Sequence, residues 1–184
     1  MYEDNILAIS IDPTEILKIM EVKTVKYKNG KIAPPDMYLG ARLKKNMING
    51  KMCWTIIRYD YVIAAVQTIK DAITRKPWNI PKTVDIPMTK SFVPELYGTE
   101  ELGPDGTQFY QEMIRMLRWA NELGRIYILH KLSILSQYQA APREGHIKEI
   151  LHIFAFLDGK PGLTLYVYPD FPRLNYSVQK NDPS

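Results

Sequence analysis

The hydrophobic periodicity of this chain changes at Tyr59, and this change limits the folds that the chain can adopt. Before Tyr59, segments 37–44 and 52–57 are rich in β-forming residues and flank Asn49-Gly50, a strong short hairpin pattern. After it, apolar residues recur at helical spacing, at Tyr61, Val62, Ala65, Val66, Ile69 and Ile73. The sequence therefore predicts an α+β fold in which a small antiparallel β-sheet or hairpin precedes a mainly helical region.

The segments on either side extend this division. Upstream, the patterns predict strands at 5–11 and 22–27, a helix at 13–21 and a turn at Asn29-Gly30. Downstream, they predict helices at 107–122, 126–138 and 145–157 and a final strand at 163–168. Residues 76–105 hold five prolines, which is typical of an extended connector. We therefore expect three units, at residues 1–75, 76–105 and 106–184.

Positive charge is concentrated in one part of the chain. Ten basic and two acidic residues lie between Lys18 and Arg58, whereas the charges balance from Tyr59 onward. Such an excess suits a surface that meets the phosphate backbone of a nucleic acid, and it also suits an ordinary solvated surface. The sequence leaves both readings open, because lysines on alternate faces of a hairpin do not act together.

Other kinds of site and anchor find little support in the sequence. The chain has no apolar run long enough for a membrane helix, and acidic Glu3 and Asp4 stand where a targeting peptide would be basic. We therefore expect an intracellular protein without a membrane partner, in either the cytoplasm or the nucleus. His146 and His152 lie about 240° apart on one predicted helix, so capping or surface roles are expected for them rather than metal binding.

Several short segments occur in a recognisable order along the chain. They are Tyr2-Glu3-Asp4-Asn5-Ile6-Leu7, Tyr38-Leu39-Gly40, Tyr61-Val62, the helix from Tyr110 to Asn121, Leu132 to Tyr138, and Pro142-Arg143-Glu144-Gly145-His146. Together they resemble the C-terminal part of a Ty/copia-type retrotransposon reverse transcriptase, from the end of the palm through the thumb and connection to the start of RNase H. Weak motifs in the right order are more specific than any one of them.

The resemblance implies roles for particular residues. Residues 1–75 would be a palm remnant with a basic β-hairpin, and residues 106–184 a thumb-like and connection-like region. In the parent enzyme, an RNA-directed DNA polymerase that uses Mg²⁺, Asp4 would be the catalytic metal ligand and the hairpin would help place the primer terminus on its template. The nucleic-acid-binding residues would be Lys26, Lys28, Lys44, Lys45 and Lys51.

The departures from the family predict a loss of catalysis. Asn5 stands where the second carboxylate of the catalytic turn would be, and a neutral amide is a poorer magnesium ligand. The family's earlier palm strand and its RNase H domain would lie beyond the two ends of this chain. We therefore expect a truncated, inactive fragment of a Gag-Pol polyprotein that binds no metal productively. The alternatives are a stand-alone basic nucleic-acid-binding module without catalysis, or a chain that does not fold alone.

Overall fold

The structure is a computed structural model that describes residues 36–82, 84–88, 92–94, 96, 98–122 and 124–167, together with Thr14, Glu15 and Lys18. The predicted strands at 5–11 and 22–27 and the turn at Asn29-Gly30 lie outside the described residues. Within the predicted helix at 13–21, the three described residues are helical.

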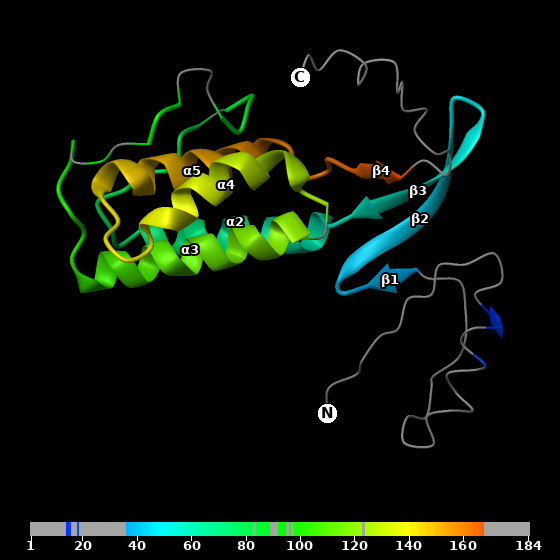
Figure 1. Ribbon diagram of the computed structural model, residues 1–184, viewed down its shortest axis with the longest axis horizontal. Coiled ribbons are helices and arrows are strands. Elements are labelled where there is room, and N and C mark those ends of the chain that lie inside the picture. The colour runs from blue at the N-terminus through cyan, green and yellow to red at the C-terminus, as the bar shows by residue number, and fades with distance from the viewer. Residues whose placement is uncertain are drawn as a thin grey trace, which may run out of the picture.

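A four-stranded antiparallel sheet lies beside a group of helices (Figure 1). The strands are β1 (Met37–Tyr38), β2 (Ala41–Ile48), β3 (Lys51–Ile57) and β4 (Leu165–Val167), and they pair in that order. The main helices are α2 (Tyr59–Ile73), α3 (Pro104–Glu122), α4 (Leu129–Leu135) and α5 (Glu144–Gly159). The predicted α+β class is confirmed, and the final strand at β4 returns to the sheet formed by the first part of the described chain.

Two tight turns shape the sheet. Asn49 and Gly50 have φ angles of 51° and 76°, the left-handed values expected of the predicted hairpin turn, and Ile48 pairs with Lys51 across it. A second turn was not predicted: Leu39 and Gly40 have φ angles of 47° and 75°, and the chain reverses there. The prediction of one strand over 37–44 was therefore wrong, because a left-handed pair ends one strand and starts the next.

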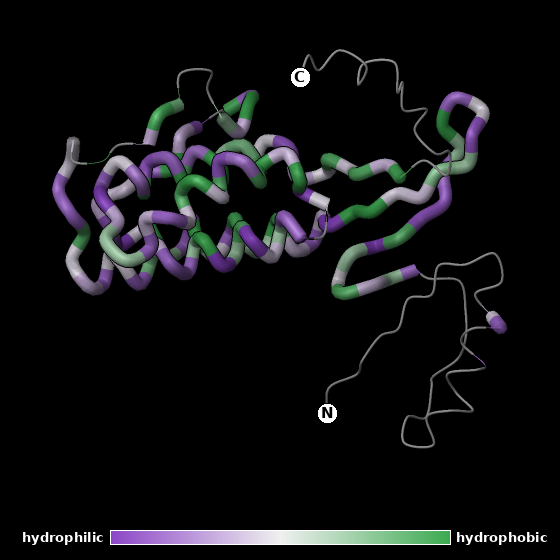
Figure 2. The backbone as a smooth tube through the Cα atoms, viewed as in Figure 1, coloured by the Kyte–Doolittle hydropathy of each residue, from purple (hydrophilic) through white to green (hydrophobic). Residues whose placement is uncertain are grey.

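The four helices share one core. Buried residues of α2, among them Val62, Val66 and Ile69, belong to the same cluster as Tyr110 of α3 and Phe154 of α5. Hydrophobic and hydrophilic residues alternate along α2 and α3, as Figure 2 shows, so each turns one face to this core. Helix α5 is buried over most of its circumference and is the central helix of the group. The core therefore contains residues from both sides of the proline-containing segment.

The proline-containing segment lies against the helices over its described residues. Trp78 stacks on Phe109 of α3 with ring centroids 5.7 Å apart, and its indole N–H donates to Glu144 at the start of α5, at 2.7 Å. Near the other end of α5, the Lys160 ammonium donates to the carbonyl of Asp85 at 2.7 Å. These contacts tie the segment to both ends of α5.

The helix boundaries differ most from the prediction at two places. Helix α3 begins at Pro104 rather than Thr107, because proline suits the first position of a helix, where no backbone hydrogen bond is lost. The predicted helix at 126–138 is divided into a 3₁₀ turn (Ile126–Ile128), α4 and a second 3₁₀ turn (Ser136–Tyr138).

The capping role expected of a histidine is confirmed at His146, whose Nδ1 accepts the N–H of Arg143, 3.1 Å away, at the start of α5.

Arg58 joins the sheet to the helices. It lies between β3 and α2 with only 4% of its surface exposed, and its guanidinium lies over the rings of Tyr61 (4.4 Å) and Trp119 (4.8 Å). Its Nη1 donates to the carbonyl of Trp119 near the end of α3, at 3.3 Å. Burial lowers the pKa of Arg58, while Tyr61 and Glu122 act in the opposite direction. Arg58 therefore fixes where the hairpin leaves the helical group.

Candidate nucleic-acid interface

The hairpin of β2 and β3 divides its basic residues between two faces. Alternate residues of a strand point to opposite faces, and directly paired residues share a face. Because Lys44 pairs with Thr55 and Ile48 pairs with Lys51, Lys44 and Lys51 lie on the same face, and Arg42 lies there with them. All three are exposed. We call Arg42, Lys44 and Lys51 the basic face.

Lys45 lies on the opposite face of the same hairpin. It pairs with Trp54, and its ammonium lies 4.9 Å from the centroid of the Trp54 ring. A cation over an aromatic face gains a modest electrostatic attraction. Of the three lysines predicted in this hairpin, the structure thus brings Lys44 and Lys51 together and separates Lys45 from them.

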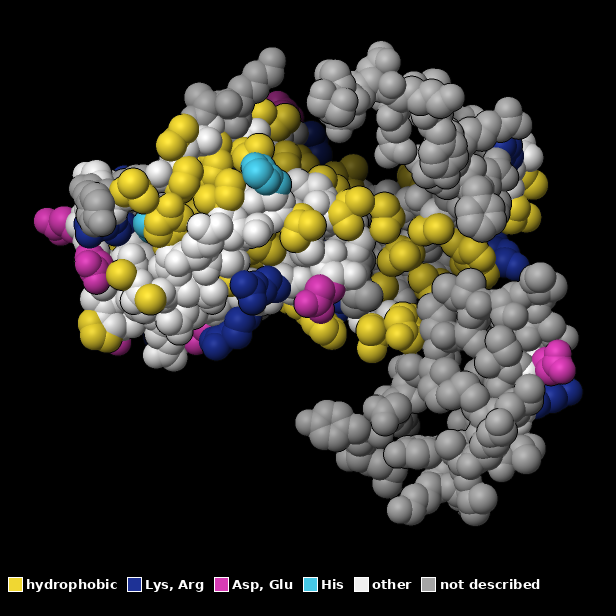
Figure 3. Space-filling model, viewed as in Figure 1, with side chains coloured by type: hydrophobic (Ala, Val, Ile, Leu, Met, Phe, Trp, Pro, Cys, Tyr) yellow, Lys and Arg dark blue, Asp and Glu magenta, His cyan; other side chains and the backbone are white. Residues whose placement is uncertain are grey.

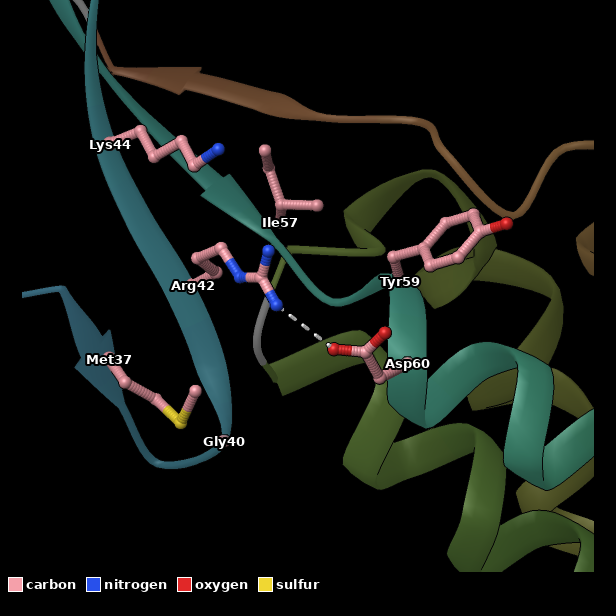
Figure 4. A pocket seen from close by; sticks show the side chains of 7 residues that line it. All are labelled: Met37, Gly40, Arg42, Lys44, Ile57, Tyr59 and Asp60. Atoms are coloured by element: carbon pink, nitrogen blue, oxygen red, sulfur yellow. Dashed lines mark hydrogen bonds and ion pairs between the residues drawn. The ribbon is translucent and has the colours of Figure 1, made fainter.

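A pocket of about 210 Å³ opens where the basic face meets the start of α2. Its cationic wall is formed by Arg42 and Lys44, its apolar wall includes Met37 and Ile57, and Asp60 of α2 lies at its edge. Figure 4 shows Arg42 projecting from β2 toward Asp60 at the start of α2, and Lys44 projecting from β2 on the side of Ile57. The reversal at Leu39-Gly40 closes the pocket on the β1 side, because Gly40 is also a lining residue.

The pocket contains one ion pair. Arg42 Nη2 lies 3.4 Å from Asp60 Oδ2, and the two side chains are 52% and 80% exposed. Exposed pairs of this kind add little stability, because water and salt screen them. Among the described residues Lys44 makes no salt bridge. The lining of the pocket thus holds two cations, Arg42 and Lys44, and one carboxylate, Asp60. The pocket can therefore accept a further negative charge.

The remaining predicted site residues lie outside the described part of the chain. They are Asp4, with its neighbour Asn5, and the two upstream lysines Lys26 and Lys28. Within the residues that the structure describes, no group of three or more His, Cys, Asp or Glu side chains could hold a metal ion. The lone cysteine, Cys53, is buried and its thiol donates to the carbonyl of Lys51, as expected of a packed residue.

Arg42 and Asp60 were missed as site residues by the sequence reasoning. The signal for Arg42 was present: a two-residue turn at Asn49-Gly50 fixes Ile48 opposite Lys51, and counting back in steps of two puts Lys44 and Arg42 on that face. Asp60 had no comparable signal. Its place in the pocket depends on how α2 leaves the sheet at Arg58.

The surface around the sheet is mixed in character. On the face drawn in Figure 3, hydrophobic side chains gather over the sheet, with Lys and Arg side chains among and beside them. Exposed Met47 and Met52 pair across the end of the hairpin, on the same face as Lys45. The basic and the more apolar face of the hairpin are therefore distinct surfaces.

Two further findings concern the class of protein. None of the helices in the described segments is long and apolar enough to cross a membrane. No protein-family model, curated protein or solved structure matches this chain.

Proposed function

We propose that this chain is the part of a copia-type retrotransposon reverse transcriptase that follows the catalytic turn, and that its β2–β3 hairpin binds the phosphate backbone of a nucleic-acid duplex. The observation that carries the proposal is the basic face, on which Arg42, Lys44 and Lys51 point the same way from one hairpin. The order of elements supports it: a hairpin, a helix, a proline-containing segment and three further helices follow one another as the family resemblance implies.

The spacing of the basic face suits a phosphate backbone. Lys44 and Ile48 are four residues apart on β2, and Lys51 lies opposite Ile48, so the two lysines are about 13 Å apart along the strand at about 3.3 Å per residue. A nucleic-acid strand carries one phosphate about every 3.4 Å of helix axis. Lys44 and Lys51 can therefore meet different phosphates of one strand, and each contact releases counterions.

The test measures binding of a labelled RNA–DNA hybrid over a series of salt concentrations. Each phosphate contact contributes about 0.9 to the slope of log affinity against log salt concentration. We expect the double variant Lys44→Gln/Lys51→Gln to bind more weakly and to have a slope shallower by about 2. The single variants Lys44→Gln and Lys45→Gln form the matched comparison, because each removes one charge and the two adjacent positions lie on opposite faces.

An equal loss of hybrid affinity from Lys45→Gln and from Lys44→Gln would show that only the total charge matters. The basic face would then not be the binding site. Wild-type protein that does not bind the hybrid even at low salt would overturn the proposed function.

The proposal includes the loss of polymerase activity. Asn5 supplies a neutral oxygen at a position where two-metal phosphoryl transfer needs a carboxylate. Primer extension with Mg²⁺ is the direct measurement, and template-dependent incorporation by the purified chain would contradict this part of the proposal. Hybrid binding without incorporation is the expected result.

A further inference from the structure

The carboxylate of Asp60 stands where a ligand anion would meet Arg42. Arg42 comes from β2 and Asp60 from the first turn of α2, so the pair bridges the two sides of the pocket in Figure 4. A guanidinium recognises carboxylate and phosphate oxygens with the same planar set of N–H donors. An anion that enters the pocket and Asp60 would thus use the same donors of Arg42.

The pocket has the other properties that a phosphate needs. Its volume of about 210 Å³ exceeds that of a phosphate group, and Lys44 adds a second cation two residues from Arg42 on the same strand. Tyr59 and Asp60, the first residues of α2, line the pocket, and the N-terminus of a helix favours negative charge. With Asp60 turned away from Arg42, both cations would face the anion.

We propose that this pocket is a phosphate site in which Asp60 competes with the bound phosphate for Arg42. The inference rests on the proposed function, because it assigns a regulating residue to the same basic face. Asp60 holds Arg42 while the pocket is empty, and a phosphate releases it. The ligand is a phosphate group, either in a nucleic-acid backbone or in a free phosphate compound, and Asp60 lowers the affinity for whichever of the two binds.

The experiment compares Asp60→Asn with wild type for two probes, a short RNA–DNA hybrid and inorganic pyrophosphate. An exposed ion pair is worth up to about a factor of five in an equilibrium constant, so we expect a two- to five-fold gain in affinity at low salt. The gain should be absent when Arg42→Gln is already present, because the competition needs both partners. Asp60→Glu should bind like wild type, since it keeps the charge.

Asp71→Asn is the matched control. Asp71 is an exposed aspartate in the same helix, near its other end, where Gln67 donates to its carboxylate. A far-UV circular dichroism melt of each variant checks that the fold is intact. A gain for the hybrid assigns the phosphate to a nucleic acid, and a gain for pyrophosphate alone assigns it to a free phosphate compound.

Three results would overturn the inference. The first is an equal gain in affinity from Asp60→Asn and Asp71→Asn, which would reflect net charge alone. The second is a gain from Asp60→Asn that persists with Arg42→Gln. The third is no gain at all. If hybrid binding still falls with Lys44→Gln/Lys51→Gln in those cases, the proposed function stands without the competition. If hybrid binding is absent altogether, the proposed function fails, and the inference fails with it unless Asp60→Asn raises the affinity for pyrophosphate.

Discussion

The substitution Tyr110→Phe tests how much one buried hydrogen bond stabilises the helical core. Tyr110 has no exposed surface, and its hydroxyl donates to the carbonyl of Leu135 at the end of α4, at 2.7 Å. Phenylalanine keeps the ring, including its tilted contact with His146, but removes this hydrogen bond. Leaving the buried carbonyl without its donor costs about 1–2 kcal/mol of unfolding free energy at neutral pH.

The same substitution should have a different effect in alkaline solution. Burial raises the pKa of Tyr110, and nearby Tyr138 raises it further. The phenol of the unfolded chain ionises near pH 10 while the folded one stays protonated, so stability present below pH 10 is lost as the pH rises. Tyr110 contributes about 1.4 kcal/mol of this loss per pH unit. Phe cannot ionise, so the variant does not undergo this loss. The difference in unfolding free energy between wild type and variant should therefore disappear at about pH 11.

The measurement is urea unfolding followed by circular dichroism at neutral pH, pH 10 and pH 11. Tyr166→Phe is the control at neutral pH: it makes the same change on a half-exposed side chain of β4 and should alter the unfolding free energy by less than about 0.5 kcal/mol. A deficit for Tyr110→Phe that is equally large at neutral pH and at pH 11 would refute the reasoning. It would mean that the hydroxyl ionises as readily in the folded protein as in the unfolded chain.

Two further predictions concern the hairpin turn and a buried charge. Gly50→Ala should lower the unfolding free energy by about 1 kcal/mol, because φ is 76° at this position. Gly103→Ala is the control in the same urea titration and should leave the unfolding free energy nearly unchanged, since Gly103 has open space around it and no positive φ. Glu149→Gln should cost about 2 kcal/mol, since it leaves the Lys131 ammonium, 1% exposed and 2.6 Å from Glu149, without its charged partner. Asp158→Asn breaks a comparable but exposed pair on the same helix and should cost less than about 1 kcal/mol, and similar losses from the two would contradict the burial argument.

The pairing within the hairpin follows from local sequence. Asn49 and Gly50 tolerate the left-handed conformation that a two-residue turn requires, and this turn sets the register of every pair from Ile48 and Lys51 back to Arg42 and Ile57. The separation of Lys44 from Lys45 follows in turn from strand geometry. The prediction was wrong at Leu39, because a leucine with φ of 47° is unusual and the single glycine after it, Gly40, is a weak turn signal.

Local sequence accounts for the α+β class, the hairpin turn and the helical periodicity after Tyr59, since each depends on residues close together in the chain. The site depends on contacts between distant parts of the chain. Arg58 belongs to the basic stretch by composition, yet it is buried against Trp119, 61 residues away, and takes no part in the basic face. Asp60 reaches Arg42 only because that buried contact fixes where α2 leaves the sheet. Such pairs depend on long-range packing between residues that are distant along the chain. Local sequence patterns do not indicate which of these residues will come into contact.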